Sequence, residues 1–199
     1  MARSGPVTIN TDALALGFAQ IRVGSSSDNI ADIQPALAAS DSIGALANTT
    51  WRGPTDWYKH ESGFPLIEDF TTPIREAAQL ECAFEEITPA NVALALGHDP
   101  NASPYSSMTS HSGEVPLGGR TAPDYVRMEA KYTYPSGTDY MYIIFPRAQV
   151  SASPEMALAA EDASAVTVMF EAKASDSNVT DGNAVWDDKA LGRIHWESD

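Results

Sequence analysis

Pairs of neighbouring acidic residues are the first feature that could do chemistry, because two carboxyl groups held close together can serve as acid and base. The sequence contains four such pairs: Glu68-Asp69, Glu85-Glu86, Glu161-Asp162 and Asp187-Asp188. Neighbouring residues of a strand point to opposite faces, so these pairs are poorly placed to share one substrate. We interpret them as solvated charge and predict no catalytic residue.

Histidine and cysteine give no sign of a metal or a nucleophile. The histidines lie far apart in the sequence and form no metal-binding spacing: His60, His98, His111 and His195. Cys82 is the single cysteine, which excludes an intramolecular disulfide and a Cys-rich zinc site. The segment 176–182 has the composition of a calcium loop, but its glycine comes one position late and the closing Glu is missing. We therefore expect no cofactor and no metal.

Motifs of known enzyme classes are also missing. The sequence contains no Gly-x-Ser-x-Gly elbow, no phosphate-binding loop and no dinucleotide fingerprint. The N-terminal residues have no apolar signal core, and no apolar run approaches the roughly 18 residues of a membrane span. We expect a non-enzymatic protein that is made and kept in the cytoplasm until it is assembled or released.

The acidic balance of the chain limits its partners. Its 199 residues include 27 Asp or Glu and 12 Lys or Arg, which gives a formal net charge of −15. Tight binding to phosphate backbones depends on Lys and Arg, so this charge disfavours a DNA clamp. Negative charge suits a surface past which DNA slides without adsorbing, although ordinary solubility or a high-salt habitat would account for it too.

Strand patterns dominate the chain and predict a mainly β protein of the α+β kind, with an antiparallel β-sandwich or barrel. The clearest alternation covers Ile74–Ile87, where an apolar face with Leu80, Cys82 and Phe84 opposes a small and polar one; a helix is the rival interpretation. The other predicted strands are 14–23, 125–134, 140–151, 165–174 and 191–196. The segment 140–145 is apolar on both faces, which favours a central strand.

A short helix is predicted at Pro89–Leu96, with Thr88 as its N-cap and Gly97 as its stop. Loop composition marks 28–48 and 175–189, and 98–123 reads as a surface loop. One domain, 1–199, is expected to begin with an N-terminal arm over 1–12.

The segment 44–73 is predicted to form a long protruding hairpin loop. Prolines and glycines interrupt any central strand here, because proline cannot donate to a ladder. Trp51, Trp57 and Tyr58 lie on this segment, and so much aromatic surface on a loop favours a contact surface, with packing back onto the domain as the alternative.

Three stretches in fixed order resemble the major tail tube proteins of long-tailed bacteriophages. They are Gly63–Phe70 (GFPLIEDF), Glu81–Glu86 and Ile87–Gly97 (ITPANVALALG). In that family a loop and a polar strand run into a helix of the form E-I-x-x-x-N-(V/L)-A-x-x-L-G. The ending, Val166–Ala174 followed by a polar loop and Leu191–Ile194, is also similar. Together these parts cover about half the chain and encode an order of elements more than a chemistry.

The resemblance implies a structural virion protein whose hexameric rings stack into the tail tube through which the genome enters the host cell. It implies a sandwich with one flanking helix, an inner wall that is one closed β-barrel, and assembly in the host cytoplasm. The implied partners are the tape-measure protein, the tail terminator and the baseplate or distal tail proteins. Double-stranded DNA would pass without specific binding, and no membrane is involved.

Two sets of residues follow from this resemblance. The candidate lumen-facing residues are Arg75, Gln79, Glu81 and Glu85. The candidate inter-subunit contacts are Trp51, Trp57, Tyr58, Phe64 and Phe70.

Two other functions fit the sequence. One is the inner tube of a contractile tail or secretion system, which shares the tube fold and is enclosed by a sheath. The other is a monomeric carbohydrate-binding β-sandwich with a stacking platform made of Trp57, Tyr58, Trp186 and Trp196.

Overall fold

The structure is a computed structural model that describes residues 20–108, 111–118, 122–151, 154–156 and 164–198. Its strands are β1 (Gln20–Ser25), β2 (Leu46–Arg52), β3 (Thr55–Ser62), β4 (Ile67–Glu76), β5 (Gln79–Phe84), β6 (Val126–Thr133), β7 (Asp139–Val150), β8 (Val166–Ala172) and β9 (Arg193–Ser198). Its helices are α1 (Ser26–Asn29) and α2 (Pro89–Ala95), with 3-10 turns η2 (Ala39–Asp41), η3 (Tyr105–Ser107) and η4 (Ala184–Trp186). The predicted fold class, mainly antiparallel β with few short helices, is confirmed.

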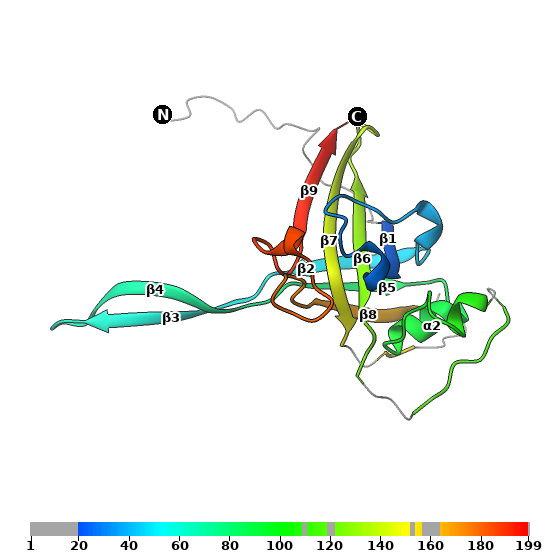
Figure 1. The fold of residues 1–199 in the computed structure, drawn as a ribbon, viewed down its shortest axis with the longest axis horizontal. Coiled ribbons are helices and arrows are strands. Elements are labelled where there is room, and N and C mark those ends of the chain that lie inside the picture. Colours follow the sequence, from blue (N-terminus) through cyan, green and yellow to red (C-terminus); the bar gives the residue numbers. More distant parts are fainter. Residues whose placement is uncertain (1–19, 109–110, 119–121, 152–153, 157–163, 199) are drawn as a thin grey trace.

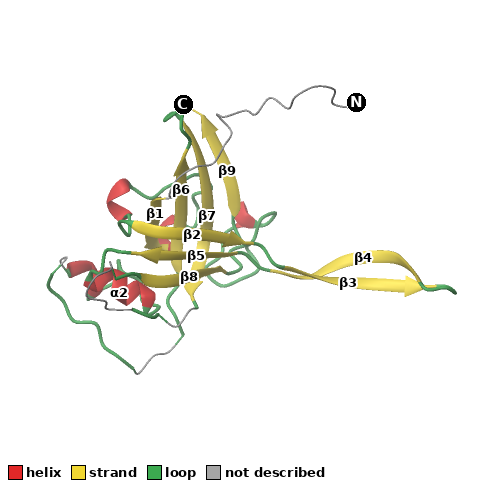
Figure 2. Cartoon of the chain, turned by 180° about the vertical axis from the view of Figure 1, so that it is seen from behind, coloured by secondary structure: helices red, strands yellow, loops and turns green. Residues whose placement is uncertain are grey.

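One seven-stranded sheet forms the body and is folded over on itself at β7. Its strand order is β1-β6-β7-β8-β5-β2, and β9 pairs with β7 outside this path. The first half of β7, 139–144, pairs with β9, and its last residues, 148–150, pair with β8. In Figures 1 and 2, β2, β5 and β8 therefore run across the direction of β6, β7 and β9.

The main core lies between these two halves of the sheet. It contains Leu80, Cys82 and Phe84 of β5, each 0% exposed. The alternating sequence pattern assigned these three side chains to one apolar face. Apolar side chains of the neighbouring strand β8 and of the facing strands β1, β6 and β7 complete the core, among them Val168, Phe170, Ile21, Met128 and Phe145. The apolar face predicted for this strand is confirmed.

The predicted strand Ile74–Ile87 is nevertheless not one element. β4 ends at Glu76 and β5 begins at Gln79. The amide of Ala77 donates to the carbonyl of Pro54 at 3.0 Å, which closes the base of the β3–β4 hairpin before the chain enters the sheet. Ile74 therefore lies outside the core, 68% exposed.

The other predicted strands shift by one or two residues where they can be compared. The predicted 125–134, 140–151, 165–174 and 191–196 correspond to β6, β7, β8 and β9. The strand predicted at 14–23 is described only from Gln20, and the expected arm, 1–12, lies outside the described residues. The expected loop 28–48 contains η2 and the start of β2.

Helix α2 ends one residue earlier than predicted and carries the predicted cap. The Thr88 hydroxyl accepts from the amide of Asn91 at 3.2 Å, and Pro89 occupies the first turn. Leu94 and Ala95 anchor the helix in the main core.

Replacing Thr88 by Ala is expected to lower the free energy of unfolding by about 1 kcal/mol, because one helix N–H loses its acceptor. Urea denaturation monitored by circular dichroism measures this change. Thr88→Ser keeps the acceptor and should remain near the wild type; equal losses in both variants would show that the cap is not the cause.

The outer face of β6 and β7 is covered by the segment that follows β1. Trp186, 0% exposed, packs there with Tyr142 and Ile144, and its indole Nε1 donates to the carbonyl of Ile30 at 2.6 Å. Arg127 and Glu129, both 0% exposed, lie on this same face of β6 and form an ion pair of 2.7 Å. A second, partly polar layer therefore holds the chain between β1 and β2 against the sheet.

Candidate assembly surfaces

The most conspicuous surface is the hairpin of β3 and β4, residues 55–76, which we call the ribbon. Figures 1 and 2 both show it extending away from the body. Its two strands form a separate two-stranded sheet. Its large apolar side chains are 48–103% exposed: Trp57, Tyr58, Phe64, Leu66, Ile67, Phe70 and Ile74.

Both faces of the ribbon are apolar. Trp57 and Tyr58 are neighbours in β3, so their side chains leave opposite faces. His60 lies two residues after Tyr58 in β3, so the two side chains share one face. Phe70 pairs with His60 across the strands and therefore lies on that same face. Trp57 and its partner Pro73 occupy the other face. A single flat contact would cover only one of these faces.

Polar bonds along the ribbon hold its register without covering its apolar side chains. Lys59 pairs with Glu68 at 2.9 Å, and Asp69 bonds to His60 at 2.7 Å and to Ser62 at 2.6 Å. The hydroxyl of Ser62 and then the ring of His60 lower the pKa of Asp69. Isolated two-stranded hairpins are marginally stable in water, so a projecting ribbon gains order from a partner.

A second surface is the side of β2, β5 and β8 turned away from the core, which we call the polar sheet face. It presents Asn48, Thr50, Arg52, Gln79, Glu81, Thr167, Met169 and Glu171. Arg52 pairs with Glu81, and Glu171 accepts from Gln79 at 3.3 Å and from Lys173 at 2.8 Å. The hydrogen bond from Lys173 lowers the pKa of Glu171, and partial burial opposes this shift without reversing it.

The structure divides the candidate lumen residues among three places. Gln79 and Glu81 share the polar sheet face. Arg75 lies in β4, on the ribbon, and Glu85 follows the end of β5 and is exposed. The expected row of four is interrupted because the chain turns at Ala77 before it enters the sheet.

The third surface is an open pocket of about 190 Å³ at the base of the ribbon, which we call the mouth pocket. Its apolar lining comes from Trp51, Ala78, Ile143, Phe145, Leu191 and Ile194. Of the candidate contacts, Trp51 alone lies here, in β2 and 45% exposed; Trp57, Tyr58, Phe64 and Phe70 are all on the ribbon.

The mouth pocket exists because β7 changes partner. β9 pairs with β7 only as far as Ile144, and β8 pairs with β7 only from Ala148 onward. Between these two points β9 and β8 diverge. Gly192 approaches β7 so closely that a Cβ there would stand 2.1 Å from the carbonyl oxygen of Ile144. Sequence analysis missed this pocket, although Gly192 between Leu191 and Arg193 marked a close approach of two backbones.

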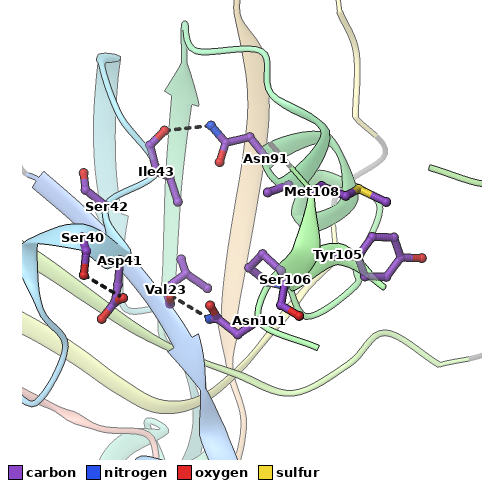
Figure 3. Close-up of a pocket in the computed structure, with 12 residues that line it drawn as sticks. Val23, Ser40, Asp41, Ser42, Ile43, Asn91, Asn101, Tyr105, Ser106 and Met108 are labelled. Atoms are coloured by element: carbon purple, nitrogen blue, oxygen red, sulfur yellow. Dashed lines mark hydrogen bonds between the residues drawn. The ribbon is translucent and has the colours of Figure 1, made fainter. Parts of the chain in front are cut away.

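A pocket of about 230 Å³ beside α2 shows no chemistry of its own (Figure 3). Its polar side chains are engaged in holding segments together. The side-chain amide of Asn91 donates to the carbonyl of Ile43 at 2.9 Å, and the side-chain amide of Asn101 donates to the carbonyl of Val23 at 3.2 Å. Asp41 accepts from the amide of Ala38 at 2.8 Å. We interpret this pocket as a joint between loops.

The aromatic platform of a carbohydrate-binding module is not formed. Trp186, predicted to be one of its members, is fully buried under the sheet. Trp57 lies on the ribbon, whereas Trp196 lies on β9 and donates to the hydroxyl of Tyr134 at 3.1 Å. These side chains come from separate parts of the molecule, so that prediction is wrong.

Within the described residues, no group of three or more His, Cys, Asp or Glu side chains could hold a metal ion. In the same part of the chain, no helix is long and apolar enough to cross a membrane.

Comparison with known proteins gives structural similarity and no sequence match. No protein-family model matches the chain, and no curated protein does. One similar solved chain is in the PVC extracellular contractile injection system, from its sheath–tube complex in the extended state. It has a TM-score of 0.43 and 8% identity, over 92% of this chain and 89% of that one. Another is in the cap that terminates the tube of the anti-feeding prophage, with a TM-score of 0.42 and 9% identity, over 97% of this chain and 100% of that one. Similarity at this level leaves the function to be argued from the chain's own residues.

Proposed function

We propose that this chain is the repeating structural subunit of a tail-like tube, in which copies join into rings and the rings stack around a channel for DNA. The observation that carries the proposal is the ribbon with apolar side chains on both faces. An isologous dimer contact would cover one face, whereas a ribbon set between two neighbours is covered on both.

The ribbon offers enough apolar area for a stable contact between copies. Its large apolar side chains are at least 48% exposed. At about half exposure each contributes on the order of 100 Å². Together these side chains offer on the order of 700 Å², divided between the two neighbours that the two faces would contact. Monomeric proteins rarely leave an apolar patch of this size open to water.

The polar sheet face suits the wall of a channel. Its side chains are short, or charged and paired with one another, as in Arg52 with Glu81. A wall of this kind leaves few free cations to hold phosphate, and the net charge of −15 opposes adsorption of DNA. The sequence resemblance to major tail tube proteins supports hexameric rings, with tape-measure, terminator and baseplate proteins as partners.

Electron microscopy of the purified full chain in negative stain, before and after concentration, tests this proposal. Stacked hollow rings are expected, together with a sedimentation coefficient that rises with protein concentration. A protein that stays monomeric at every concentration reached would overturn the proposal. Particles purified from the producing cell then show whether a sheath encloses the tube, which separates a contractile from a non-contractile tail.

Charge reversal on the polar sheet face tests the channel assignment. In Glu81→Lys a new cation would stand beside Arg52, and assembled tubes are expected to bind double-stranded DNA, with binding that weakens as salt rises. Co-sedimentation of tubes with DNA measures this binding. Glu197→Lys, a reversal of the same size on exposed β9, is the control. Equal DNA binding by both variants would contradict the assignment.

A further inference from the structure

The mouth pocket has the size and chemistry to hold an aromatic ring. Its volume is about 190 Å³ and its lining is mostly apolar. An apolar cavity of about 150 Å³ is large enough to bind benzene. Trp51 forms part of the wall and is 45% exposed, so one aromatic face is already available for stacking.

The tip of the ribbon presents a fully exposed aromatic ring. Phe64 is 103% exposed, and Leu66 beside it is 68% exposed. Just behind the tip, Glu61 lies opposite Glu68 across the strands, and Glu68 is already paired with Lys59. The single charged residue in the lining of the mouth pocket is Arg193. The tip and the pocket are therefore complementary in apolar character, and Glu61 is the tip carboxylate whose charge is opposite to that of Arg193.

The ribbon of one chain cannot place its tip in its own pocket. The mouth pocket includes Trp51 and Ala78, which lie at the two ends of the ribbon where it leaves the body. Figures 1 and 2 show β3 and β4 running straight away from this point. A Phe64 ring in this pocket would therefore come from another molecule.

We propose that the mouth pocket receives the Phe64 ring from the ribbon tip of a second copy of this chain. The inference rests on the proposed function, because it identifies where the ribbon of one subunit engages the next. Tip and pocket are different surfaces, and in the proposed rings and stacks the contact runs head-to-tail and repeats from copy to copy. A head-to-tail contact produces a closed ring or an extended stack rather than a dimer.

Disulfide trapping between two singly substituted proteins tests this contact directly. Phe64→Cys and Ile194→Cys are mixed under a mild oxidant, and dimers linked through residues 64 and 194 are expected from the mixture. The native thiol of Cys82 does not interfere, because burial raises its pKa to about 12. The variant that carries both Phe64→Cys and Ile194→Cys in one chain should give a series of disulfide-linked multimers. Leu117→Cys mixed with Ile194→Cys is the control, since Leu117 is 84% exposed outside the ribbon.

The trapping results separate this inference from the proposed function. If rings form without a disulfide between residues 64 and 194, the tip-in-pocket contact is overturned and the tube proposal stands. The same holds if Phe64→Cys alone gives as much disulfide-linked dimer as the mixture. Absence of both rings and linkage would overturn both proposals.

Side-chain truncation gives an independent readout. Phe64→Ser is expected to weaken self-association at least about 30-fold, the effect of losing one interface hot spot. Leu117→Ser, measured alongside by sedimentation velocity, should leave association unchanged. Equal behaviour of the two variants would contradict the proposal.

Discussion

Replacing residues 56–75 by Asn-Gly is expected to abolish assembly and leave a folded monomer. The shortened hairpin keeps the pairing of Thr55 with Glu76 and the bond from Ala77 to Pro54, and Asn-Gly suits a two-residue hairpin turn. The described ribbon contributes no buried apolar side chain to the core. Sedimentation velocity and electron microscopy measure assembly, and near-ultraviolet circular dichroism checks packing.

Point variants on the two faces refine this result. Trp57→Ser and Phe70→Ser each remove an aromatic side chain from a different face of the ribbon. Interface hot spots of this kind contribute about 2–4 kcal/mol, so each variant should weaken association roughly 30- to 1000-fold. If only one of them has an effect, the ribbon contacts a single neighbour. Rings formed by the shortened chain would show that the ribbon is not the assembly element.

Replacing Arg127 by Met is expected to destabilise the fold by about 3–5 kcal/mol, because it leaves a buried carboxylate without its partner. The guanidinium pairs with Glu129 at 2.7 Å and donates to the carbonyls of Asn29 at 2.6 Å, Asp32 at 2.8 Å and Gln34 at 2.8 Å. The variant therefore also frees the segment that covers the outer face of the sheet. Urea denaturation gives the change in the free energy of unfolding.

Arg22→Met is the matched control for this loss. Arg22 donates to the carbonyl of Leu37 at 2.7 Å, in the same covering segment, and to the side chain of Gln20 at 2.9 and 3.2 Å, but it is only part-buried and has no buried acid as its partner. Its replacement should cost less, about 2 kcal/mol, as for hydrogen bonds from a charged group that leave no buried charge behind. Similar losses in both variants would show that the buried ion pair is not what makes Arg127 important.

The features that sequence analysis predicted well are those that depend on near neighbours. Alternation identified the buried face of β5, and the Thr-Pro start and Gly stop identified α2, because each pattern is set within a few residues. The break between β4 and β5 escaped prediction because alternation continues through it, while the bond from Ala77 to Pro54 joins segments more than twenty residues apart.

Features made by contacts between distant segments were missed. The mouth pocket combines β2, β7 and β9, and no local pattern shows that β7 exchanges one partner for another. Trp186 was expected on a surface platform and is instead buried under a segment 156 positions away. One signal was present: Arg127 and Glu129, two apart on a strand, point to the same face and so predict a pair.

The separation of the ribbon from the core has an evolutionary consequence. Between Thr55 and Glu76 no described side chain belongs to the buried apolar set, so in the proposed assembly substitutions there would change the fit between copies without changing the stability of the body. Selection for folding and selection for assembly thus act on different residues. In the proposed tube, two diverging lineages would cease to co-assemble through changes in the ribbon while their sandwich stays the same.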